Sequence, residues 1–173
     1  MMTITAKEFK QRFPQFLDKL GLREVDTLLA ATQRVDATPG QVLLRAGEKN
    51  DSMYLLWDGS LEIKMQADGE EVSLGRLVPG QAFGAVALIE PGSALVTAIA
   101  VEASVVLRLS HEQLADLRQR QPRVGGLVLR ALSLDLAERL RLYEEGMVAR
   151  GSPPRDAEEF ALLCRPLLGV KNV

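Results

Sequence analysis

One stretch, residues 83–98, combines a glycine turn, a short helix signal and small apolar side chains in a way that could bind a ligand. Gly84 has no Cβ atom, so its backbone can turn sharply or approach a ligand closely. A helix that begins near Ala85–Ala87 would present free backbone N–H groups, and such a helix end attracts anions without any charged side chain. The side chains that follow, at positions 94–96, are apolar. The stretch therefore favours an apolar ligand or no ligand.

No other residues form a catalytic or metal-binding pattern. His111 is the single histidine, which excludes a histidine-based metal centre such as the several-histidine site of cupin enzymes. It follows Ser110, whose spacing to Gln113 is that of a helix cap, and we expect it to be an exposed first-turn residue. Cys164 lacks the turn that surrounds nucleophilic serines and cysteines, which argues against a His111–Cys164 dyad. The sequence predicts no catalytic residue, no metal site and no enzyme activity.

The length and composition are those of one globular domain, or of one domain with an appendage. The 173 residues are 47% hydrophobic and 25% charged, which argues against wholesale disorder, and a net charge of −2 argues against a surface for nucleic acid. The arginines between positions 118 and 141 are interspersed with acidic residues, so they indicate a solvated surface of mixed charge. A single cysteine excludes an internal disulfide, and no apolar run approaches the ~20 residues needed to span a membrane. We therefore expect a cytoplasmic protein without membrane association.

The elements that must position the ligand-binding stretch fall into four zones. The first, residues 1–37, is helical in pattern, because Thr5 and Glu8 have capping-box spacing and apolar residues then recur every three or four positions. Pro14 lies within this run and predicts a kink or a break. A second helix is expected over Leu22–Arg34.

The second zone, residues 38–110, changes to a period of two and contains several glycine turns, which predicts an antiparallel β-barrel or jelly roll. Asp58-Gly59 and Asp68-Gly69 lie between runs of alternating apolar residues, which is the strongest short-range signal of a β-hairpin. The expected strands are 42–44, 53–57, 61–65, 71–74, 95–101 and 104–109.

The third zone, residues 111–146, returns to a helical pattern. The helix expected over Arg123–Glu145, ended by Gly146, carries apolar residues on nearly every side. A helix wetted on one side does not have this pattern, so the helix must pack on the β-structure and also on a second chain. Positions spaced by three and four predict a parallel dimer seam. The expected interface residues are Val124, Leu127, Val128, Ala131 and Leu134.

The fourth zone, residues 147–173, is a tail that begins with a linker signal at Gly151-Ser152-Pro153-Pro154. One short helix is expected around Ala157–Cys164, and four large apolar side chains within and after it are available to dock on the rest of the protein. These side chains are Phe160, Leu163, Leu167 and Leu168.

The frame Phe83-Gly84-x-Val86-Ala87-Leu88 resembles the phosphate-binding cassette of cyclic-nucleotide-binding domains, which reads F-G-E-L/I-A/G-L, then a short turn, then R-A/S-A/S/T. The order of helices, glycine-rich β-structure, cassette, two strands, short helix and long helix over residues 15–145 is also the family's order. The long helix is similar to the dimerisation helix of the bacterial activators of the catabolite activator protein type. Further matches lie at Gly47-Glu48, Tyr54-Leu55-Leu56, Gly59-Ser60-Leu61 and Leu77–Gln81.

The two polar residues that hold the sugar and the phosphate in this family are missing here. Ala85 stands where the family has Glu, which accepts from the ribose 2′-hydroxyl, and Ala94 stands where it has Arg, which binds the cyclic phosphate. Leu95 takes the Arg position if the turn is aligned one residue differently. Each such bond contributes on the order of 1.5–3 kcal/mol, so losing both lowers the affinity by about two to four decades. We expect no cofactor and no saturable cyclic AMP binding at micromolar concentration.

The resemblance also implies where a ligand would be contacted. In these activators, hydroxyl residues far along the long helix reach the base, and Tyr143 and Glu144 resemble those positions. Because Glu144 would repel an anionic ligand, we expect Tyr143 to pack at the mouth of the β-structure or in the dimer seam. The candidate ligand-binding residues are Phe83, Gly84, Ala85, Val86, Ala87, Ala94, Leu95, Val96, Thr97 and Tyr143.

The function implied is a stand-alone regulatory or sensor module with lost or altered nucleotide binding, which signals through its homodimer and a separate protein partner. Two alternatives stay open: a ligand-free protein-interaction module whose cassette is a relic, and a sensor of a less polar ligand or a cyclic dinucleotide. The activators carry a winged helix-turn-helix after the long helix, whereas residues 146–173 contain no basic recognition helix. We therefore expect no direct sequence-specific DNA binding.

Overall fold

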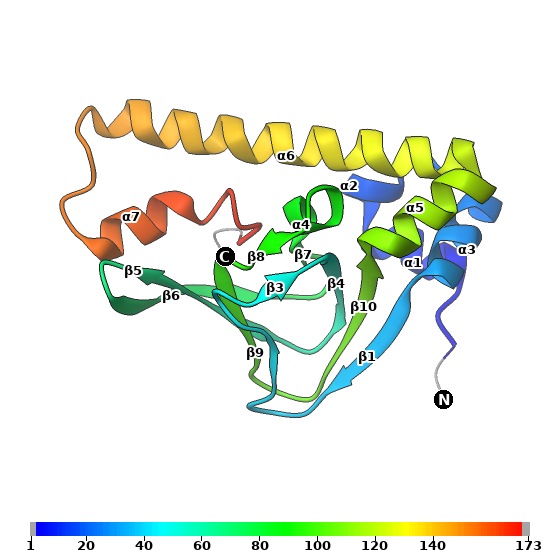
Figure 1. Cartoon of the computed structure of the whole chain (residues 1–173), viewed down its shortest axis with the longest axis horizontal. Helices are drawn as coiled ribbons and strands as arrows, with labels where there is room; N and C mark the ends of the chain where they lie inside the picture. Colours follow the sequence, from blue (N-terminus) through cyan, green and yellow to red (C-terminus); the bar gives the residue numbers. More distant parts are fainter. Residues whose placement is uncertain (1–2, 171–173) are drawn as a thin grey trace.

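Figure 1 shows the computed structural model, which describes residues 3–170; the outermost positions of the expected N-terminal zone and tail, 1–2 and 171–173, lie outside the described residues. The helices are α1 (Ala6–Arg12), α2 (Pro14–Leu17), α3 (Leu22–Ala31), α4 (Ala85–Ile89), α5 (His111–Arg120), α6 (Pro122–Arg150) and α7 (Ala157–Cys164). The strands are β1 (Gln33–Ala37), β2 (Val42–Leu44), β3 (Lys49–Asn50), β4 (Ser52–Asp58), β5 (Leu61–Ala67), β6 (Glu70–Leu77), β7 (Ala82–Phe83), β8 (Gly92–Ser93), β9 (Val96–Ala100) and β10 (Ser104–Ser110). The long helix α6 runs across the whole molecule above the strands.

The first two helices form as the capping and proline signals predict. The Thr5 hydroxyl accepts the Glu8 N–H and the Glu8 carboxylate accepts the Thr5 N–H, which confirms the capping box of α1. Pro14 is the first residue of α2, where its missing N–H costs nothing, so the chain divides into two helices at this point. Phe9 and Phe13 are completely buried beneath them.

The next helix is shorter than predicted. α3 ends at Ala31, and Thr32 is already extended, with φ −85° and ψ 153°. Residues 33–37 form β1, which pairs along its whole length with β10. The helix expected from Leu22 is confirmed, but its expected end at Arg34 and the zone boundary expected after residue 37 are wrong, because pairing with a distant strand outweighs a local helical pattern.

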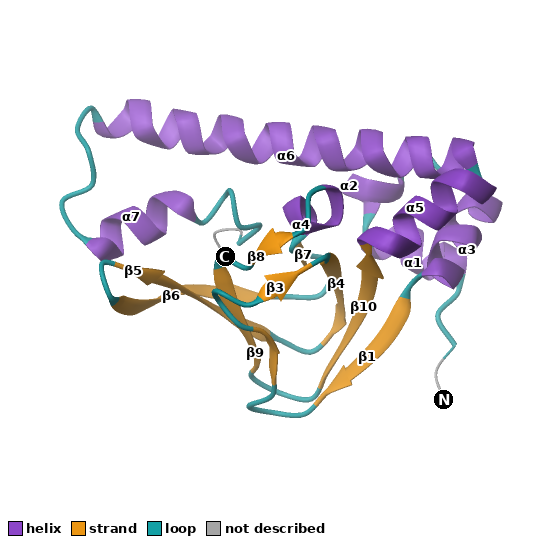
Figure 2. Ribbon diagram, viewed as in Figure 1, coloured by secondary structure: helices purple, strands orange, loops and turns teal. Residues whose placement is uncertain are grey.

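The β-structure consists of two four-stranded antiparallel sheets, which confirms the predicted mainly-β fold with flanking helices (Figure 2). One sheet has the order β1-β10-β4-β7 and the other has the order β2-β9-β5-β6. A two-stranded ribbon of β3 and β8 lies beside them. Within the described residues no strand belongs to both sheets, so the arrangement is a jelly roll rather than a closed barrel.

The two Asp-Gly turns differ although their sequence signals are alike. Asp68 and Gly69 have φ of 51° and 83° and join β5 to its hairpin partner β6, as predicted. Asp58-Gly59 instead leads from β4 in one sheet to β5 in the other, so the hairpin predicted there is wrong. Gly59 has φ 88°, and a Cβ atom on it would lie 2.3 Å from the Ser104 hydroxyl oxygen, so the glycine serves a close crossing of two segments.

The C-terminal helices extend further than predicted. Ser110 caps α5 with Gln113 as its partner, which confirms the second capping box. α6 continues to Arg150 and ends at Gly151, which has φ 66° and ψ 3°. The end expected at Gly146 is wrong, and so is the zone boundary there. Gly146 lies inside the helix, where a Cβ atom would come within 3.0 Å of Leu163, so this glycine allows α7 to approach α6.

Alternation along the central strands divides the buried side chains into two cores. The first core lies between one sheet and the helices α1–α3, α5 and α6; it takes Met53, Leu55 and Trp57 from β4. The second core lies between the two sheets and takes Tyr54 and Leu56 from the same strand. β4 therefore contributes to both cores because successive side chains point to opposite faces.

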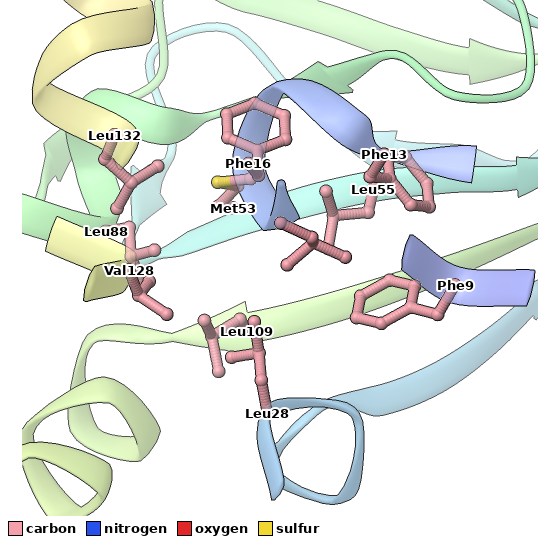
Figure 3. Close-up of a pocket in the computed structure, with 11 residues that line it drawn as sticks. Phe9, Phe13, Phe16, Leu28, Met53, Leu55, Leu88, Leu109, Val128 and Leu132 are labelled. Carbon is pink, nitrogen blue, oxygen red and sulfur yellow. The ribbon is translucent and has the colours of Figure 1, made fainter. Parts of the chain in front are cut away.

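The first core is closely packed. Figure 3 shows its aromatic and aliphatic side chains converging from α1, α2, α6 and the strands around a small gap. The gap measures about 20 Å³ and is lined entirely by apolar residues. That is room for about one water molecule and offers it no polar partner, so the gap is a packing void and not a ligand site.

The tail completes the second core. α7 forms where predicted and packs on β5 and β6, but the side chains that it buries are Ala157, Ala161 and Cys164. Phe160, which was expected to dock, is 43% exposed, so that prediction is wrong. The helix docks through small residues because they let its backbone approach the sheet closely.

Candidate ligand-binding site

The cassette turn is fixed by one glycine. Gly84 connects β7 to α4 with φ 78° and ψ 12°, a left-handed conformation that favours glycine. A Cβ atom at this position would lie 2.5 Å from the Ser52 carbonyl oxygen and 3.2 Å from Asn50 Nδ2. The turn is therefore pressed against the segment that links β3 to β4. Stacking of the Tyr54 and Phe83 rings, with centroids 4.8 Å apart, holds β7 in register with β4.

Buried polar groups support the turn from below. Asn50 is 5% exposed; its Nδ2 donates to the Ser52 carbonyl at 2.9 Å, and its Oδ1 accepts the Ser52 N–H at 3.1 Å. Thr97 is also buried, and its hydroxyl accepts the Ala46 N–H at 3.1 Å. These groups are occupied by the protein itself, so they hold the backbone around the cavity.

A cavity of about 230 Å³ lies between the cassette, the β3–β8 ribbon, α6 and the tail. Eight of the ten predicted site residues line it. These are Phe83, Gly84, Ala85, Val86, Ala87, Ala94, Leu95 and Val96. Thr97 does not line this cavity, and its hydroxyl accepts from the turn at Ala46, between β2 and β3.

Tyr143 also lies outside the cavity lining. Its side chain is half-buried and packs against the second core, whereas Glu144 is exposed. Tyr143 therefore packs against the β-structure, in line with the expectation. It does not belong to the residues that line the cavity.

Apolar side chains occupy the two cavity-wall positions where the family has the Glu and Arg that bind the sugar and the phosphate. Ala85 is 3% exposed and Ala94 is 8% exposed, so each is a closed part of the wall. Leu95 is 70% exposed and lines the open rim. None of these three side chains can accept a hydrogen bond from a hydroxyl group or pair with a phosphate.

Sequence reasoning missed the wall that faces the cassette. Leu136 and Arg139 reach the cavity from α6, and Leu167 and Leu168 reach it from the tail. A signal for Arg139 was present: Val128, Leu132, Asp135 and Arg139 follow three-and-four spacing, so the buried stripe of α6 continues into a charged pair. The remaining lining residues that were missed are Leu44, Asn50, Glu90, Gly92 and Ser93.

Arg139 and Asp135 form a largely buried ion pair. The Arg139 Nε atom lies 2.7 Å from Asp135 Oδ2, and the two side chains are 11% and 15% exposed. Arg139 also borders a neighbouring cavity of about 560 Å³ on the side of α7, whose lining includes Asp135, Glu138 and Arg165. Arg139 therefore lies between the cassette cavity, whose other lining residues are mostly apolar, and a neighbouring cavity that several charged residues line.

The tail is held at both ends. After α6, Glu159 accepts from Arg155 at 2.7 Å and from Arg150 at 2.5 Å, and Asp156 caps α7. The side-chain bond from Arg155, with its backbone N–H and Arg150 adding to it, lowers the pKa of Glu159 from 4.5 to about 2. At the other end, Gly169 has φ 81°, and a Cβ atom on it would lie 2.6 Å from both the Ala82 carbonyl oxygen and Arg139 Nη1.

The structure separates the two residues considered for nucleophilic chemistry. His111 Nδ1 lies 2.9 Å from the Leu88 carbonyl oxygen, and this contact ties the start of α5 to α4. Cys164 is buried in the second core, and its burial raises the pKa of the thiol. A protonated, buried thiol is a poor nucleophile.

The predicted dimer seam is partly wrong. Val124 and Val128 are 3% and 6% exposed and belong to the first core of their own chain, Leu127 and Ala131 are half-buried, and Leu134 is 56% exposed. The helix carries apolar residues on nearly every side, so spacing alone did not decide which stripe faces inward. The outward large apolar residues are Leu134, Leu140, Leu142, Met147 and Val148.

Within residues 3–170, no cluster of three or more His, Cys, Asp and Glu side chains has the arrangement of a metal site. The same residues contain no helix with the length and hydropathy that a membrane span requires.

A family model described as the cyclic nucleotide-binding domain matches residues 34–121, just over half of the chain. The chain belongs to the cyclic nucleotide-binding domain family. The match runs from β1 to the end of α5, so it contains the cassette and both sheets. This membership confirms the resemblance found in the sequence.

Individual relatives agree with the family assignment. The chain is 32% identical over 123 residues to the Cyclic AMP receptor protein of Thermus thermophilus, covering 70% of this chain and 55% of that protein. It is 30% identical over 124 residues to Glutaminase 2 of Bradyrhizobium diazoefficiens, covering 72% of this chain and 19% of that protein. The crystal structure of Thermus thermophilus Catabolite Activator Protein superimposes with a TM-score of 0.70 and 30% identity, covering 80% of this chain and 63% of that one. The chain thus spans about half the length of the receptor protein.

Proposed function

We propose that the chain is a regulatory module that has lost the family's mode of binding cyclic AMP and signals through contacts of α6 with a second copy and with a protein partner. The observation that carries the first part is the apolar chemistry of Ala85, Ala94 and Leu95 in the cavity wall. A cyclic phosphate would lose its hydration there and gain no charge-assisted bond from these cassette side chains.

The tail supports the same conclusion. Leu167 and Leu168 close the cavity from a third side, and its volume of about 230 Å³ is below the roughly 300–1,000 Å³ typical of sites for drug-sized ligands. A nucleotide would therefore have to displace part of the tail, and the tail is packed into the second core.

Isothermal titration calorimetry tests this part. The unmodified chain should show no saturable binding of cyclic AMP, cyclic GMP or cyclic di-GMP at micromolar concentration. Ala85→Glu with Leu95→Arg returns both polar groups, and we expect weak saturable cyclic AMP binding because the two bonds together contribute about 3–6 kcal/mol. Ile89→Glu with Leu95→Arg is the matched control, since Ile89 is 39% exposed on the same helix and does not line the cavity. Micromolar cyclic AMP binding by the unmodified chain would refute the proposal.

The outward face of α6 supports the second part. Leu134, Leu140 and Val148 are 56%, 49% and 81% exposed on a helix whose opposite face is already buried. Small residues at positions 126, 133 and 137 lie exposed between them and would let a second α6 approach closely. A two-fold seam of this kind buries each leucine against its mate.

Light scattering at micromolar concentration tests the seam. We expect about twice the chain mass of 18.9 kDa for the unmodified protein and the single mass for Leu134→Glu with Leu140→Glu. Leu22→Glu is the control, because Leu22 is 54% exposed at the start of α3 and does not belong to the outward face of α6. A monomeric unmodified chain, or a dimeric double variant, contradicts the seam.

The proposal includes no enzymatic activity. The glutaminase relative shares 19% of its own length with this chain, so the match shows a shared module and carries no argument about that reaction. The apolar side chains of the cassette and the raised pKa of the buried Cys164 thiol support this part of the proposal.

A further inference from the structure

Among the described residues, one cationic group lines the cassette cavity, and it comes from the long helix. Arg139 is 11% exposed and lines the cavity together with apolar side chains of the cassette and tail. Its Nε atom lies 2.7 Å from Asp135 Oδ2 in an ion pair. A guanidinium carries five N–H donors, so an arginine paired with one carboxylate can bind a further anion.

The fold makes specific room for this guanidinium. A Cβ atom on Gly169 would lie 2.6 Å from Arg139 Nη1, and φ of 81° at Gly169 also favours glycine. The tail thus passes directly over the guanidinium while its leucines, Leu167 and Leu168, form the adjacent cavity wall. Arg139 is therefore held at the boundary of the cavity from two sides, by α6 and by the tail.

The charges nearby decide which anion fits. Asp135 balances part of the Arg139 charge, and Glu90 also lines the cavity, so a dianion such as a free phosphate monoester would meet net repulsion. A monoanion would meet the Arg139 guanidinium, the one cationic group that lines the cavity among the described residues. The neighbouring cavity is lined by the acids Asp135 and Glu138 as well as by Arg139 and Arg165, so it offers an anion no excess of positive charge.

The other residues that line the cavity indicate the chemical character of the group that carries the anion. The cavity is lined by the apolar side chains Ala94, Val96, Leu136 and Leu168, which favour a compact apolar body. The binding geometry expected from these walls is a charged head at α6 and an apolar body against the cassette.

We propose that this cavity binds a small carboxylate with an apolar body, such as a medium-chain fatty acid, with its carboxylate on Arg139. This inference rests on the proposed function, because it requires that the cassette no longer recognises a cyclic phosphate. The charged group of the ligand then binds to the long helix α6 and not to the cassette. Ligand binding therefore depends on the position of α6.

Titration calorimetry with octanoate, and with octan-1-ol as its uncharged counterpart, tests the proposal. We expect saturable octanoate binding by the unmodified chain. Asp135→Asn with Arg139→Gln removes the guanidinium without leaving Asp135 as an uncompensated buried charge, and it should weaken octanoate binding roughly tenfold to a hundredfold. The weaker binding of octan-1-ol should stay within about twofold, because its apolar contacts are unchanged. Arg141→Gln is the matched control, since Arg141 lies on the same helix but is exposed, and it should leave both affinities unchanged.

Two results would overturn the proposal: no octanoate binding by the folded unmodified chain, or equal octanoate affinity in the Asp135→Asn, Arg139→Gln variant. Circular dichroism of each variant confirms that it is folded. A failure of this proposal can be distinguished from a failure of the proposed function, because octanoate binding tests the first and cyclic AMP binding tests the second. A chain that binds neither compound refutes the carboxylate site alone, whereas micromolar cyclic AMP binding refutes the proposed function.

Discussion

The two cores of this protein share the strand β4 but differ in how they are closed. The first core is sealed by the bulky side chains of α1, α2 and α6 around a void of about 20 Å³. The second core is closed by small side chains of α7 and by Val170, and it borders the cavity of about 230 Å³ at the cassette. The family's ligand-binding elements therefore lie against the less tightly filled region, where a segment of the chain itself takes part in the closure.

This difference indicates a division of roles. Large side chains in rigid packing stabilise the first core, whereas the second core depends on a peripheral segment that is joined to the rest by a linker after Gly151. Regions that depend on a few peripheral contacts open at lower free energy than a closely packed core. We therefore expect the tail region to respond to changes that leave the first core intact.

The largest effect is expected from emptying the first core. Phe13 is completely buried and lies edge-on to Phe9, with centroids 5.4 Å apart, so Phe13→Ala should lower the free energy of unfolding by about 3–5 kcal/mol. Urea unfolding followed by circular dichroism measures it. The control from the tail is Phe160→Ala, which should cost about 0.5 kcal/mol or less because Phe160 is 43% exposed. Similar costs for both substitutions would contradict the proposed difference between the cores.

An intermediate effect is expected from loosening the tail. Gly169→Ala places a Cβ atom against the Ala82 carbonyl oxygen in a left-handed conformation, and it should cost about 2–3 kcal/mol. Gly151→Ala has the same backbone strain at φ 66° but open space around the new atom, so about 1 kcal/mol is expected. Hydrogen exchange should show lost protection over residues 157–168 in Gly169→Ala while α1 and β10 stay protected. Equal loss in both regions would mean that the two cores unfold as one unit.

The smallest effect concerns the ion pairs at the start of the tail. The pKa of Glu159 is lowered to about 2 by Arg155 and Arg150, so its contribution to stability is complete above about pH 4.5 and is lost as the pH falls towards 2. The difference in Tm between the unmodified chain and Glu159→Gln should therefore shrink over this interval. Glu158→Gln, at an exposed neighbouring position, serves as the control. A difference that is constant from pH 5 to pH 2 would show that the ion pairs do not hold the tail.

Much of the first core could be predicted from the sequence. The capping box at Thr5, the break at Pro14 and the spacing of Phe9, Phe13 and Phe16 are local signals, and local geometry decides them. The six expected strands lie within three residues of their observed ends, because alternation along strands such as β4 and β10 reflects two buried faces. The strands β1, β3, β7 and β8 were not predicted.

The second core and the cavity could be predicted only in part. The cassette residues were found because a glycine turn and its neighbours form one continuous motif. Ala157 and Ala161 gave no signal, because small residues dock through backbone proximity and not through hydrophobicity. Arg139 was missed because the three-and-four spacing that connects it to Val128 and Leu132 defines only one of several apolar stripes on α6, and the sequence does not distinguish which stripe faces the sheets.

The position of Val170 in the second core has a consequence for the order of events during synthesis. The first core needs no residue beyond the middle of α6, so it can close while the tail is still being translated. The second core must wait for a segment that follows β10 by some sixty positions, from Ser110 to Val170. Until that segment arrives, the inner faces of both sheets lack part of their cover, and the nascent chain is most prone to misassociation during this interval.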